Sequence, residues 1–255
     1  MNPFLNWNDF VDIYDWEFDF MCDEQKHDVE FYLSKIIDNK TKILEFGAGT
    51  GRITLELLKS GCDVTAVDNA EKFLDKLQSR CHDFNNLKPV LSDMLSFQSD
   101  DIFDLIIISY STFQYLLDKD NQKNMFDKLS NLLSDNGRLY IDISPFTALG
   151  NPLPDYYPFY LKFHDELQAD ISMFTSYTID KANMIQSWKD KYLIKYLNGN
   201  EYEFIHYLSL RRIEIEEMYG LANNSGLKVN HLYGSFSGNE PNEDSANWIF
   251  EIVKA

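Results

Sequence analysis

The stretch from Lys42 to Asp68, KILEFGAGTGRITLELLKSGCDVTAVD, constrains the fold more than any other part of the chain. Lys42–Phe46 is a short apolar segment that predicts a strand, and the glycine cluster after it predicts a tight turn. From Arg52 onwards apolar residues recur at roughly helical spacing, and Gly61 is the kind of residue that ends a helix. Cys62–Val67 predicts a second buried strand. The stretch therefore predicts a strand–turn–helix–strand unit, which is typical of parallel α/β sheets.

The turn of this unit is the first candidate ligand site. Its sequence, Gly47-Ala48-Gly49-Thr50-Gly51, carries almost no side-chain bulk, so its backbone can approach a ligand closely. Asp68 stands at the tip of the next strand, where an acid can accept both hydroxyls of a ribose. A glycine loop at a helix N-terminus with such an acid indicates a nucleotide site, and a tight turn without a ligand is the alternative. The dinucleotide spacing G-x-G-x-x-G is absent, which disfavours a nicotinamide oxidoreductase.

Glu45 precedes the loop, and the G-x-G-x-G spacing with that acid resembles the first motif of class I S-adenosylmethionine (SAM) methyltransferases. The resemblance implies SAM as the cofactor and S-adenosylhomocysteine as its product, with the methionine part and the ribose of the cofactor against the loop. The residues that it implies around the cofactor are Tyr14, Glu45, Phe46, Gly47, Ala48, Gly49, Gly51, Arg52, Asp68, Asn69, Asp93, Met94, Ser109 and Tyr110.

Residues 1–40 form a leader rich in aromatic and acidic side chains, in which Asp28–Ile37 predicts an amphipathic helix. We expect the leader to be a helical cap over the cofactor, with plain packing on the sheet as the alternative. Its sequence YDWEF…DVEFYLSKI, which begins at Tyr14, resembles the leader of bacterial small-molecule methyltransferases. In those relatives a leader tyrosine reaches the SAM pocket. The resemblance implies the same place for Tyr14, whose hydroxyl can also orient the acceptor as part of the catalytic site.

Three further strands are predicted: Lys88–Leu91, Phe103–Ser109 and Arg138–Ile143. The middle one is a continuous apolar run, as in a parallel strand buried on both faces. Asp93 follows the first of them and can accept a hydrogen bond from the amine of an adenine while Met94 packs on the ring, although such an acid is more often a turn cap. Because strands and helices alternate, a doubly wound parallel sheet is the expected architecture.

The segment Ser109–Leu116 follows the central strand at its carboxyl end, where open α/β sheets bind their ligands. We therefore expect Tyr110 and Phe113 to contact the acceptor. The segment resembles the fourth-strand motif of the same methyltransferases, in which an asparagine often stands at the position of Ser111 and a histidine at that of Tyr115. This sequence departs at both positions, which puts a base at the second position in doubt. Tyr115 can still orient an amine or a hydroxyl by a hydrogen bond, as a catalytic group.

Residues 145–210 break the alternation of strands and helices and predict an inserted antiparallel sheet, in which Asn198–Asn200 is a hairpin signal. The predicted strands are Ile171–Ile179, Met184–Trp188, Tyr192–Leu197 and Tyr202–Leu210. We expect this sheet to serve either as a lid or substrate wall, or as a dimer surface. The candidate residues that it offers are His164 as a catalytic group, and His206 with the adjoining Arg211 for binding the acceptor.

A last helix, Arg212–Asn223, and two strands, Leu227–Tyr233 and Asn247–Val253, complete the predicted domain. This tail resembles that of the same enzymes, in which the last two strands form an antiparallel hairpin at the sheet edge. The resemblance covers nearly the whole chain. It implies a doubly wound, Rossmann-like sheet of seven strands, the last one antiparallel, with an antiparallel β subdomain inserted after the fifth strand. The SAM-binding domain then comprises residues 41–144 and 211–255.

The amino-acid composition and the net charge limit the classes of molecule that the protein is expected to bind. The net charge of −18 repels phosphate backbones and anionic lipids, which disfavours nucleic acids and membrane surfaces. No run approaches the roughly 20 apolar residues that a membrane helix needs, and the N-terminal segment lacks the pattern of a secretory signal. Cys22, Cys62 and Cys81 have no C-x-x-C spacing, so we expect no metal site and no disulfide framework, and a reducing cytoplasm fits best.

These features predict a SAM-dependent methyltransferase that acts on a nitrogen or oxygen of a small-molecule acceptor, either as a monomer or as a homodimer. Methyl transfer needs mainly the alignment of the nucleophile with the methyl group and the exclusion of water, so a catalytic triad is not required. Two alternatives stay open. One is a catalytically silent SAM-binding protein with a regulatory or interaction role, and the other is a tRNA or other nucleic-acid methyltransferase, which the charge disfavours.

Overall fold

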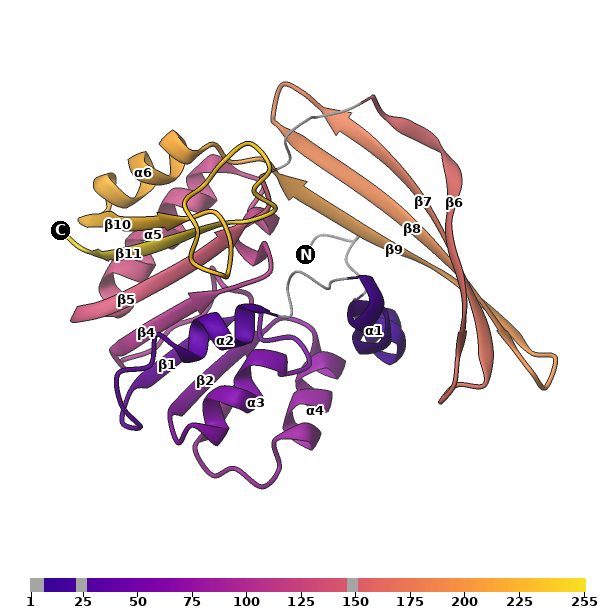
Figure 1. Cartoon of the computed structure of the whole chain (residues 1–255), viewed down its shortest axis with the longest axis horizontal. Helices are drawn as coiled ribbons and strands as arrows, with labels where there is room; N and C mark the ends of the chain where they lie inside the picture. Colours follow the sequence, from indigo (N-terminus) through magenta and orange to yellow (C-terminus); the bar gives the residue numbers. More distant parts are fainter. Residues whose placement is uncertain (1–6, 22–26, 146–150) are drawn as a thin grey trace. The chain divides into compact units, whose positions relative to one another are not determined.

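A computed structural model describes residues 7–21, 27–145 and 151–255 of the chain, so parts of the predicted leader and of the insertion, with Cys22, lie outside the described residues. Contacts along the backbone divide the chain into two compact units, which Figure 1 shows. One unit combines residues 1–21 with 148–211, and the other combines residues 22–147 with 212–255. In the described part, no helix is long and apolar enough to cross a membrane.

The larger unit is built on a sheet of seven strands in the order β10-β11-β5-β4-β1-β2-β3, which confirms the predicted doubly wound, Rossmann-like architecture. Its elements are α2 (Asp28–Leu33), β1 (Lys42–Phe46), α3 (Arg52–Lys59), β2 (Asp63–Asp68), α4 (Glu71–Arg80), β3 (Leu87–Leu91), β4 (Phe103–Ile108), the 3₁₀ helix η2 (Thr112–Tyr115), α5 (Lys119–Leu132), β5 (Leu133–Ile143), α6 (Ile215–Asn224), β10 (Leu227–Tyr233) and β11 (Trp248–Lys254).

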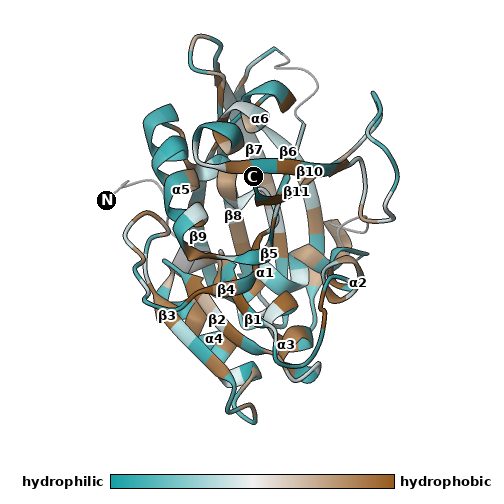
Figure 2. Ribbon diagram, turned by 90° about the vertical axis from the view of Figure 1, so that its left-hand side faces the viewer, coloured by the Kyte–Doolittle hydropathy of each residue, from teal (hydrophilic) through white to brown (hydrophobic). Residues whose placement is uncertain are grey.

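Each central strand sends alternate side chains to two hydrophobic clusters, one on each face of the sheet. In β4, Leu105 and Ile107 belong to one cluster, and Ile106 and Ile108 belong to the other. The first cluster contains buried residues of α2, α3 and α4, whereas the second contains those of α5 and α6. Helices therefore cover both faces of the sheet. The visible surface of α5 is mostly hydrophilic, as expected for a helix that buries a single stripe (Figure 2).

The carboxyl ends of the parallel strands meet at one edge of the sheet. Strands β1 to β5 run parallel to their neighbours. Strand β11 is antiparallel to both β5 and β10, so β10 points in the same direction as β5. Four segments therefore lie at this edge, where ligands bind in open α/β sheets. They are the glycine loop after β1, the last residue of β2, the turn after β4 and the loop after β10.

The fifth strand is longer than predicted, because β5 begins at Leu133 rather than at Arg138. Strand pairing passes from Leu133 opposite Phe103 to Arg138 opposite Leu105, with a shift of register between them. The extra residues form a bulge, and their turn-forming sequence explains why the strand was predicted to begin only after them. The predicted helix after residue 28 is also shorter than expected, since α2 ends at Leu33.

The smaller unit contains α1 (Trp7–Met21) and an antiparallel sheet in the order β6-β7-β8-β9. Its strands are β6 (Leu153–His164), β7 (Ala169–Asp180), β8 (Ile185–Tyr196) and β9 (Glu201–Arg211). The inserted antiparallel sheet is thus confirmed, but two of its predicted strands are one strand, β8, which continues through the charged residues 189–191. Strand β6 escaped prediction because it holds Pro154 and Pro158, which an edge strand tolerates.

Helix α1 packs on this sheet through aromatic and polar contacts. The Phe10 ring stacks on that of His206, with ring centroids 4.7 Å apart, and the Trp16 ring stacks on that of His164 at 4.8 Å. The carboxylate of Glu17 accepts hydrogen bonds from the hydroxyls of Tyr160 and Tyr192. Burial raises the pKa of Glu17 to about 7 against the opposing effect of these bonds.

Candidate functional site

The loop between β1 and α3 has a backbone that glycine alone adopts readily. Gly47, Gly49 and Gly51 all have positive φ angles, of 70°, 58° and 87°. The amides of Gly47 and Ala48 both donate to the carbonyl of Val67 at the end of β2, at 2.8 and 3.1 Å. These bonds hold the loop against the tip of the neighbouring strand.

Two of the three glycines are also required by their surroundings. A Cβ atom at Gly47 would lie 2.5 Å from Oγ1 of Thr112, and one at Gly51 would lie 2.8 Å from Cγ of Leu77. A Cβ atom at Gly49 would meet nothing closer than 3.8 Å. The loop is therefore packed tightly against η2 and α4 on its two flanks, while a side chain at its middle glycine would make only an ordinary contact with the ring of Phe73.

Asp68 lies at the end of β2 beside this loop. Its Oδ2 accepts a hydrogen bond from the amide of Gly49 at 2.8 Å, and its Oδ1 accepts one from the amide of Ala70 at 2.9 Å. Burial raises the pKa of the carboxyl, and the backbone hydrogen bonds oppose that effect. Because each carboxylate oxygen can accept two hydrogen bonds, the side chain keeps acceptor capacity for a ligand. Asn69, next to it, is exposed.

Glu45 is almost completely buried in β1, inside the domain beneath the loop. It accepts a hydrogen bond from the hydroxyl of Thr54 at 2.5 Å, and burial raises its pKa to about 7. Phe46 is fully buried as well, with its ring edge-on to that of Phe97. Part of the sequence motif therefore has a structural role, because Glu45 is hydrogen-bonded to Thr54 in α3, the helix that follows the loop.

Arg52 is the first residue of α3 and forms a bidentate ion pair with Asp28. Its guanidinium nitrogens lie 2.5 and 2.6 Å from the two carboxylate oxygens. Asp28 is 1% exposed and stands at the start of α2. Paired hydrogen bonds of this kind fix orientation as well as distance. Arg52 therefore ties the end of the glycine loop to the helix that precedes β1.

Asp93 follows β3 and is exposed. Its Oδ1 accepts from the amide of Leu95 at 2.8 Å, which is the turn-capping arrangement that the sequence offered as the alternative. Met94 is partly buried against the core. Lys128 on α5 holds the same turn, because its ammonium donates to the carbonyls of Met94, Leu95 and Phe97 at 3.1, 2.5 and 2.7 Å. Partial burial lowers the pKa of Lys128.

The turn after β4 has an unusual backbone. Tyr110 and Ser111 both adopt left-handed conformations, with φ of 53° and 60°, which cost side-chain-bearing residues free energy. Asp142 at the end of β5 holds this turn, since it accepts from the amides of Tyr110 and Ser111 at 2.9 and 3.2 Å. Its Oδ2 also accepts from the hydroxyl of Tyr32 at 2.7 Å. Burial raises the pKa of Asp142 to about 6, against these hydrogen bonds.

The remaining predicted residues of this turn are arranged in different environments. Ser109 is buried, whereas the Tyr110 side chain is 38% exposed and Tyr115 is partly exposed. Phe113 is fully buried, with its ring edge-on to that of Phe126 in the core. The structure thus brings together, at one edge of one sheet, all the predicted cofactor residues that belong to the larger unit.

Tyr14, His164, His206 and Arg211 belong to the smaller unit. Tyr14 is partly buried on α1, with its ring edge-on to that of Phe10. His164, His206 and Arg211 are all at least 96% buried. Burial lowers the pKa of His206 to about 4, so its imidazole is neutral at pH 7. The buried Nε2 of His164 has no hydrogen-bond partner among the described residues.

Sequence reasoning missed Asp142, Tyr32 and Thr112. A signal for Asp142 was present, because an acid inside the apolar strand RLYIDI has to find hydrogen-bond partners when it is buried. Tyr32 and Thr112 gave no such signal, since their contacts join segments far apart in the chain. In the described ranges, no group of three or more histidine, cysteine or acidic residues is arranged to hold a metal ion.

The chain is similar in sequence and in fold to proteins that are named as methyltransferases. A family model described as "Methyltransferase domain" matches residues 43–137, from β1 through the loop, Asp68, Asp93 and the turn after β4. The putative methyltransferase YqeM of Bacillus subtilis (strain 168) is 24% identical over 228 residues, which are 88% of each chain.

Solved structures share the whole fold. The CcbJ methyltransferase from Streptomyces caelestis has a TM-score of 0.81 at 19% identity, over 96% of each chain. An S-adenosylmethionine-dependent methyltransferase from Clostridium acetobutylicum has a TM-score of 0.82 at 17% identity, over 98% of this chain and 99% of the other. The sugar N-methyltransferase KedS8 from Streptoalloteichus sp. has a TM-score of 0.74 at 14% identity, over 95% of this chain and 93% of its own.

Residues 43–137 match a methyltransferase domain, and the whole chain shares the fold of solved methyltransferases. The geometry of this domain fits SAM, the cofactor that the sequence resemblance implies. The glycine loop is less tightly packed at Gly49 than at its two flanking glycines, and the Asp68 carboxylate accepts the amide of Gly49 there. The ligand that the loop admits need not carry a pyrophosphate, because the shorter glycine spacing leaves out the extra residue of the dinucleotide fingerprint.

Proposed function

We propose that the chain is a SAM-dependent methyltransferase that transfers a methyl group to a nitrogen or oxygen of a small-molecule acceptor, and that nitrogen is the atom in its preferred substrate. The observation that carries the proposal is the shared edge of the sheet, where the glycine loop and Asp68 stand beside the braced turn of Tyr110 and Ser111. Such an edge can hold a cofactor at β1 and β2 and an acceptor at β4 and β5.

The cofactor supplies a methyl group on a sulfonium, which is already a strong electrophile. The backbone of the loop, from Gly47 to Gly51, would lie against the bound cofactor, and Asp68 would accept hydrogen bonds from its ribose. Asp93 would accept one from the adenine amine through its carboxylate, with Met94 against the ring, and Ser109 and Tyr110 would complete the contacts. The other predicted cofactor residues are proposed to act indirectly, by maintaining the shape of the loop and of the adjoining strand tip. They are Glu45, Phe46, Ala48, Arg52 and Asn69.

An amine acceptor suits the groups at the turn after β4. A tyrosine, Tyr115, stands where relatives with a fourth-strand histidine would have a base. A neutral amine carries its own lone pair and needs orientation more than proton removal, so hydroxyl groups suffice to position it. The structural similarity to a sugar N-methyltransferase supports nitrogen as the methylated atom. The net charge of −18 favours a neutral or cationic acceptor over an anionic one or a nucleic acid.

The roles of the other candidate residues are proposals of the same kind. Tyr14 and His164 are proposed to act on the acceptor as catalytic groups, and His206 and Arg211 are proposed to bind it. Phe113 is fully buried, so it is proposed to act by supporting the turn that carries Tyr110. It stays a prediction that residues 145–210 form an acceptor wall or a dimer surface. The cap formed by residues 1–40 and the cytoplasmic location stay predictions as well.

The test of the proposed function is a titration followed by a screen. SAM and S-adenosylhomocysteine should bind to the full chain with saturable heats. The full chain with SAM should then add the mass of one methyl to an amine-containing compound in a metabolite extract, and tandem mass spectrometry should place the methyl on nitrogen. Saturable SAM binding with no methylated product from any extract would favour the catalytically silent alternative instead.

A further inference from the structure

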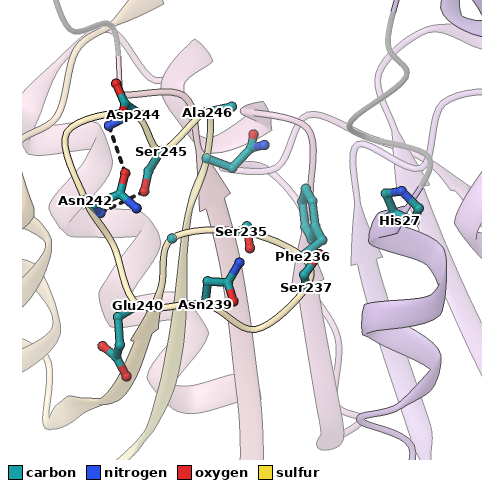
Figure 3. A pocket seen from close by; sticks show the side chains of 12 residues that line it. His27, Ser235, Phe236, Ser237, Asn239, Glu240, Asn242, Asp244, Ser245 and Ala246 are labelled. Carbon is teal, nitrogen blue, oxygen red and sulfur yellow. Dashed lines mark hydrogen bonds between the residues drawn. The ribbon is translucent and has the colours of Figure 1, made fainter.

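The loop between β10 and β11 encloses a pocket of about 520 Å³ that no part of the proposed cofactor site uses (Figure 3). Residues 234–247 make up this loop, and His27 at the start of α2 closes one side. Strand β10 ends at the same edge of the sheet as β1, β4 and β5. The pocket therefore opens at the edge where ligands bind, and its volume lies in the range of small-molecule sites.

The loop has a defined internal structure. The amide of Gly234 donates to the carbonyl of Asn239 at 2.7 Å, and the amide of Asn242 donates to the hydroxyl of Ser245 at 2.9 Å. The amide of Asp244 donates to Oδ1 of Asn242 at 2.8 Å. A Cβ atom at Gly234 would lie 2.5 Å from Cα of Pro241, so the two arms of the loop touch there. The pocket is thus an open hollow that is lined by a folded loop.

The floor of the pocket offers uncharged hydrogen-bonding groups and one aromatic ring. Ser235 contributes a buried hydroxyl that has no hydrogen-bond partner among the described residues. Asn247 and Ser245 are at most 9% exposed, and the Phe236 ring is 8% exposed. In Figure 3 the side chains of Ser235 and Phe236 lie close together, with Asn239 on the opposite arm of the loop. A buried hydroxyl without a partner is costly, and a ligand or a water molecule removes that cost.

The charges around the pocket define what can enter it. Among the described residues, the lining includes the acids Glu240 and Asp244 and the imidazole of His27, but no lysine or arginine. Of these described groups, only His27 could offset the charge of a phosphate or carboxylate ligand, which would also face the two acids. The serine and asparagine side chains can instead form hydrogen bonds with the hydroxyl groups of a small ligand, and the aromatic ring can contact its carbon skeleton. If the ligand also carries an amine, the two acids can balance its positive charge.

We propose that this pocket binds a small hydroxyl-rich molecule, uncharged or carrying an amine, through Ser235, Asn247 and the exposed part of the Phe236 ring. The proposal concerns binding alone and stands whether or not the occupant is methylated. Under the proposed function, the place of the pocket at the carboxyl edge makes the acceptor its natural occupant.

The probes are glucose, glucosamine and myo-inositol, with glucose 6-phosphate as the anionic comparison. The full chain, labelled with nitrogen-15, is titrated with each to high millimolar concentration, and amide shifts are followed. We expect saturable shifts at amides of residues 234–247 with at least one of the three non-anionic probes, and at least tenfold weaker binding of glucose 6-phosphate.

Three variants locate the binding. Asn239→Trp places a large ring in the lining and should abolish the shifts. Ser235→Ala removes the hydroxyl that lacks a partner and should weaken binding about tenfold. Glu243→Trp changes the same loop outside the lining and should leave binding within twofold of wild type.

The proposal is overturned if none of the three probes gives saturable shifts in the loop, which would mean that water alone fills the pocket. It is also overturned if Asn239→Trp binds as well as Glu243→Trp does, or if glucose 6-phosphate binds as tightly as glucose. The amide spectrum of each variant reports whether it is folded. SAM binding, measured separately on the same samples, tests the proposed function without deciding this outcome.

Discussion

The hydroxyl of Tyr32 donates to Oδ2 of Asp142 over 2.7 Å, although 110 residues separate them in the chain. The same carboxylate accepts the amides of Tyr110 and Ser111, whose left-handed backbone it holds in place. One buried acid thus links α2, the end of β5 and the turn after β4. The shape of the proposed acceptor side of the site depends on this link.

Tyr32→Phe should lower the free energy of unfolding by about 1–3 kcal/mol, because it removes a hydrogen bond from a buried carboxylate and puts nothing in its place. Urea denaturation measures the change. Tyr219→Phe is the matched control, since Tyr219 is 39% exposed, and it should change stability by less than about 0.5 kcal/mol. Equal stability of the two variants would show that the Tyr32 hydroxyl does not support Asp142.

Gly47→Ala should be more destabilising than Gly49→Ala. Both positions have positive φ and carry a similar backbone cost, of about 1–2 kcal/mol for a residue with a side chain. Only the new methyl at position 47 would collide with Thr112, whereas that at position 49 would meet nothing closer than 3.8 Å. Thermal and urea unfolding of the pair measure the difference. A larger loss for Gly49→Ala would contradict the packing of the loop against η2.

Glu45 should make the protein less stable as the pH rises from about 4.5 to 7. Its pKa is raised by burial from the ordinary 4.5 to about 7, so the folded state keeps a proton that the unfolded state releases in this window. This stabilisation, of about 3 kcal/mol, is fully present below pH 4.5 and is lost as the pH rises to about 7. Asp142, with a pKa near 6, acts in the same direction.

The measurement is the urea midpoint of wild type and of Glu45→Gln at pH 5 and at pH 8. The amide of the variant can still accept the hydroxyl of Thr54 but cannot ionise. We expect the stability of the wild type to fall more steeply between these pH values than that of the variant. Parallel pH profiles would show that Glu45 ionises as freely in the folded protein as in the unfolded chain.

Lys128→Met should weaken cofactor binding without contacting the cofactor. Its ammonium holds three carbonyls of the turn that carries Asp93, and losing it frees that turn. We expect faster amide hydrogen exchange at residues 93–97 and about tenfold weaker binding of S-adenosylhomocysteine. Lys123→Met on the exposed side of the same helix is the control and should change neither. Unaltered exchange at the turn in Lys128→Met would remove this positioning role.

The sequence predicted most of the larger unit because each element there has a local signal. The glycine loop, the apolar run of β4 and the acid at Asp68 can each be recognised from a few neighbouring residues. The bracing of the site could not be predicted, since Asp28 with Arg52 and Tyr32 with Asp142 are pairs formed by tertiary packing. Strand β6 was missed for a different reason. Its prolines argue against a strand, and only its place at a sheet edge makes them tolerable.

The most direct test of the account is the affinity of S-adenosylhomocysteine for Asp68→Ala, measured by isothermal titration calorimetry beside wild type. Asp63→Ala, at the exposed start of the same strand, is the matched control, and circular dichroism checks that both variants are folded. We expect Asp68→Ala to lose about 1.5–3 kcal/mol, or roughly 10- to 150-fold in affinity, because charge-assisted hydrogen bonds to the ribose disappear. Asp63→Ala should bind as wild type does. Equal affinities of a folded Asp68→Ala and the wild type would contradict the assignment of the cofactor to this edge of the sheet.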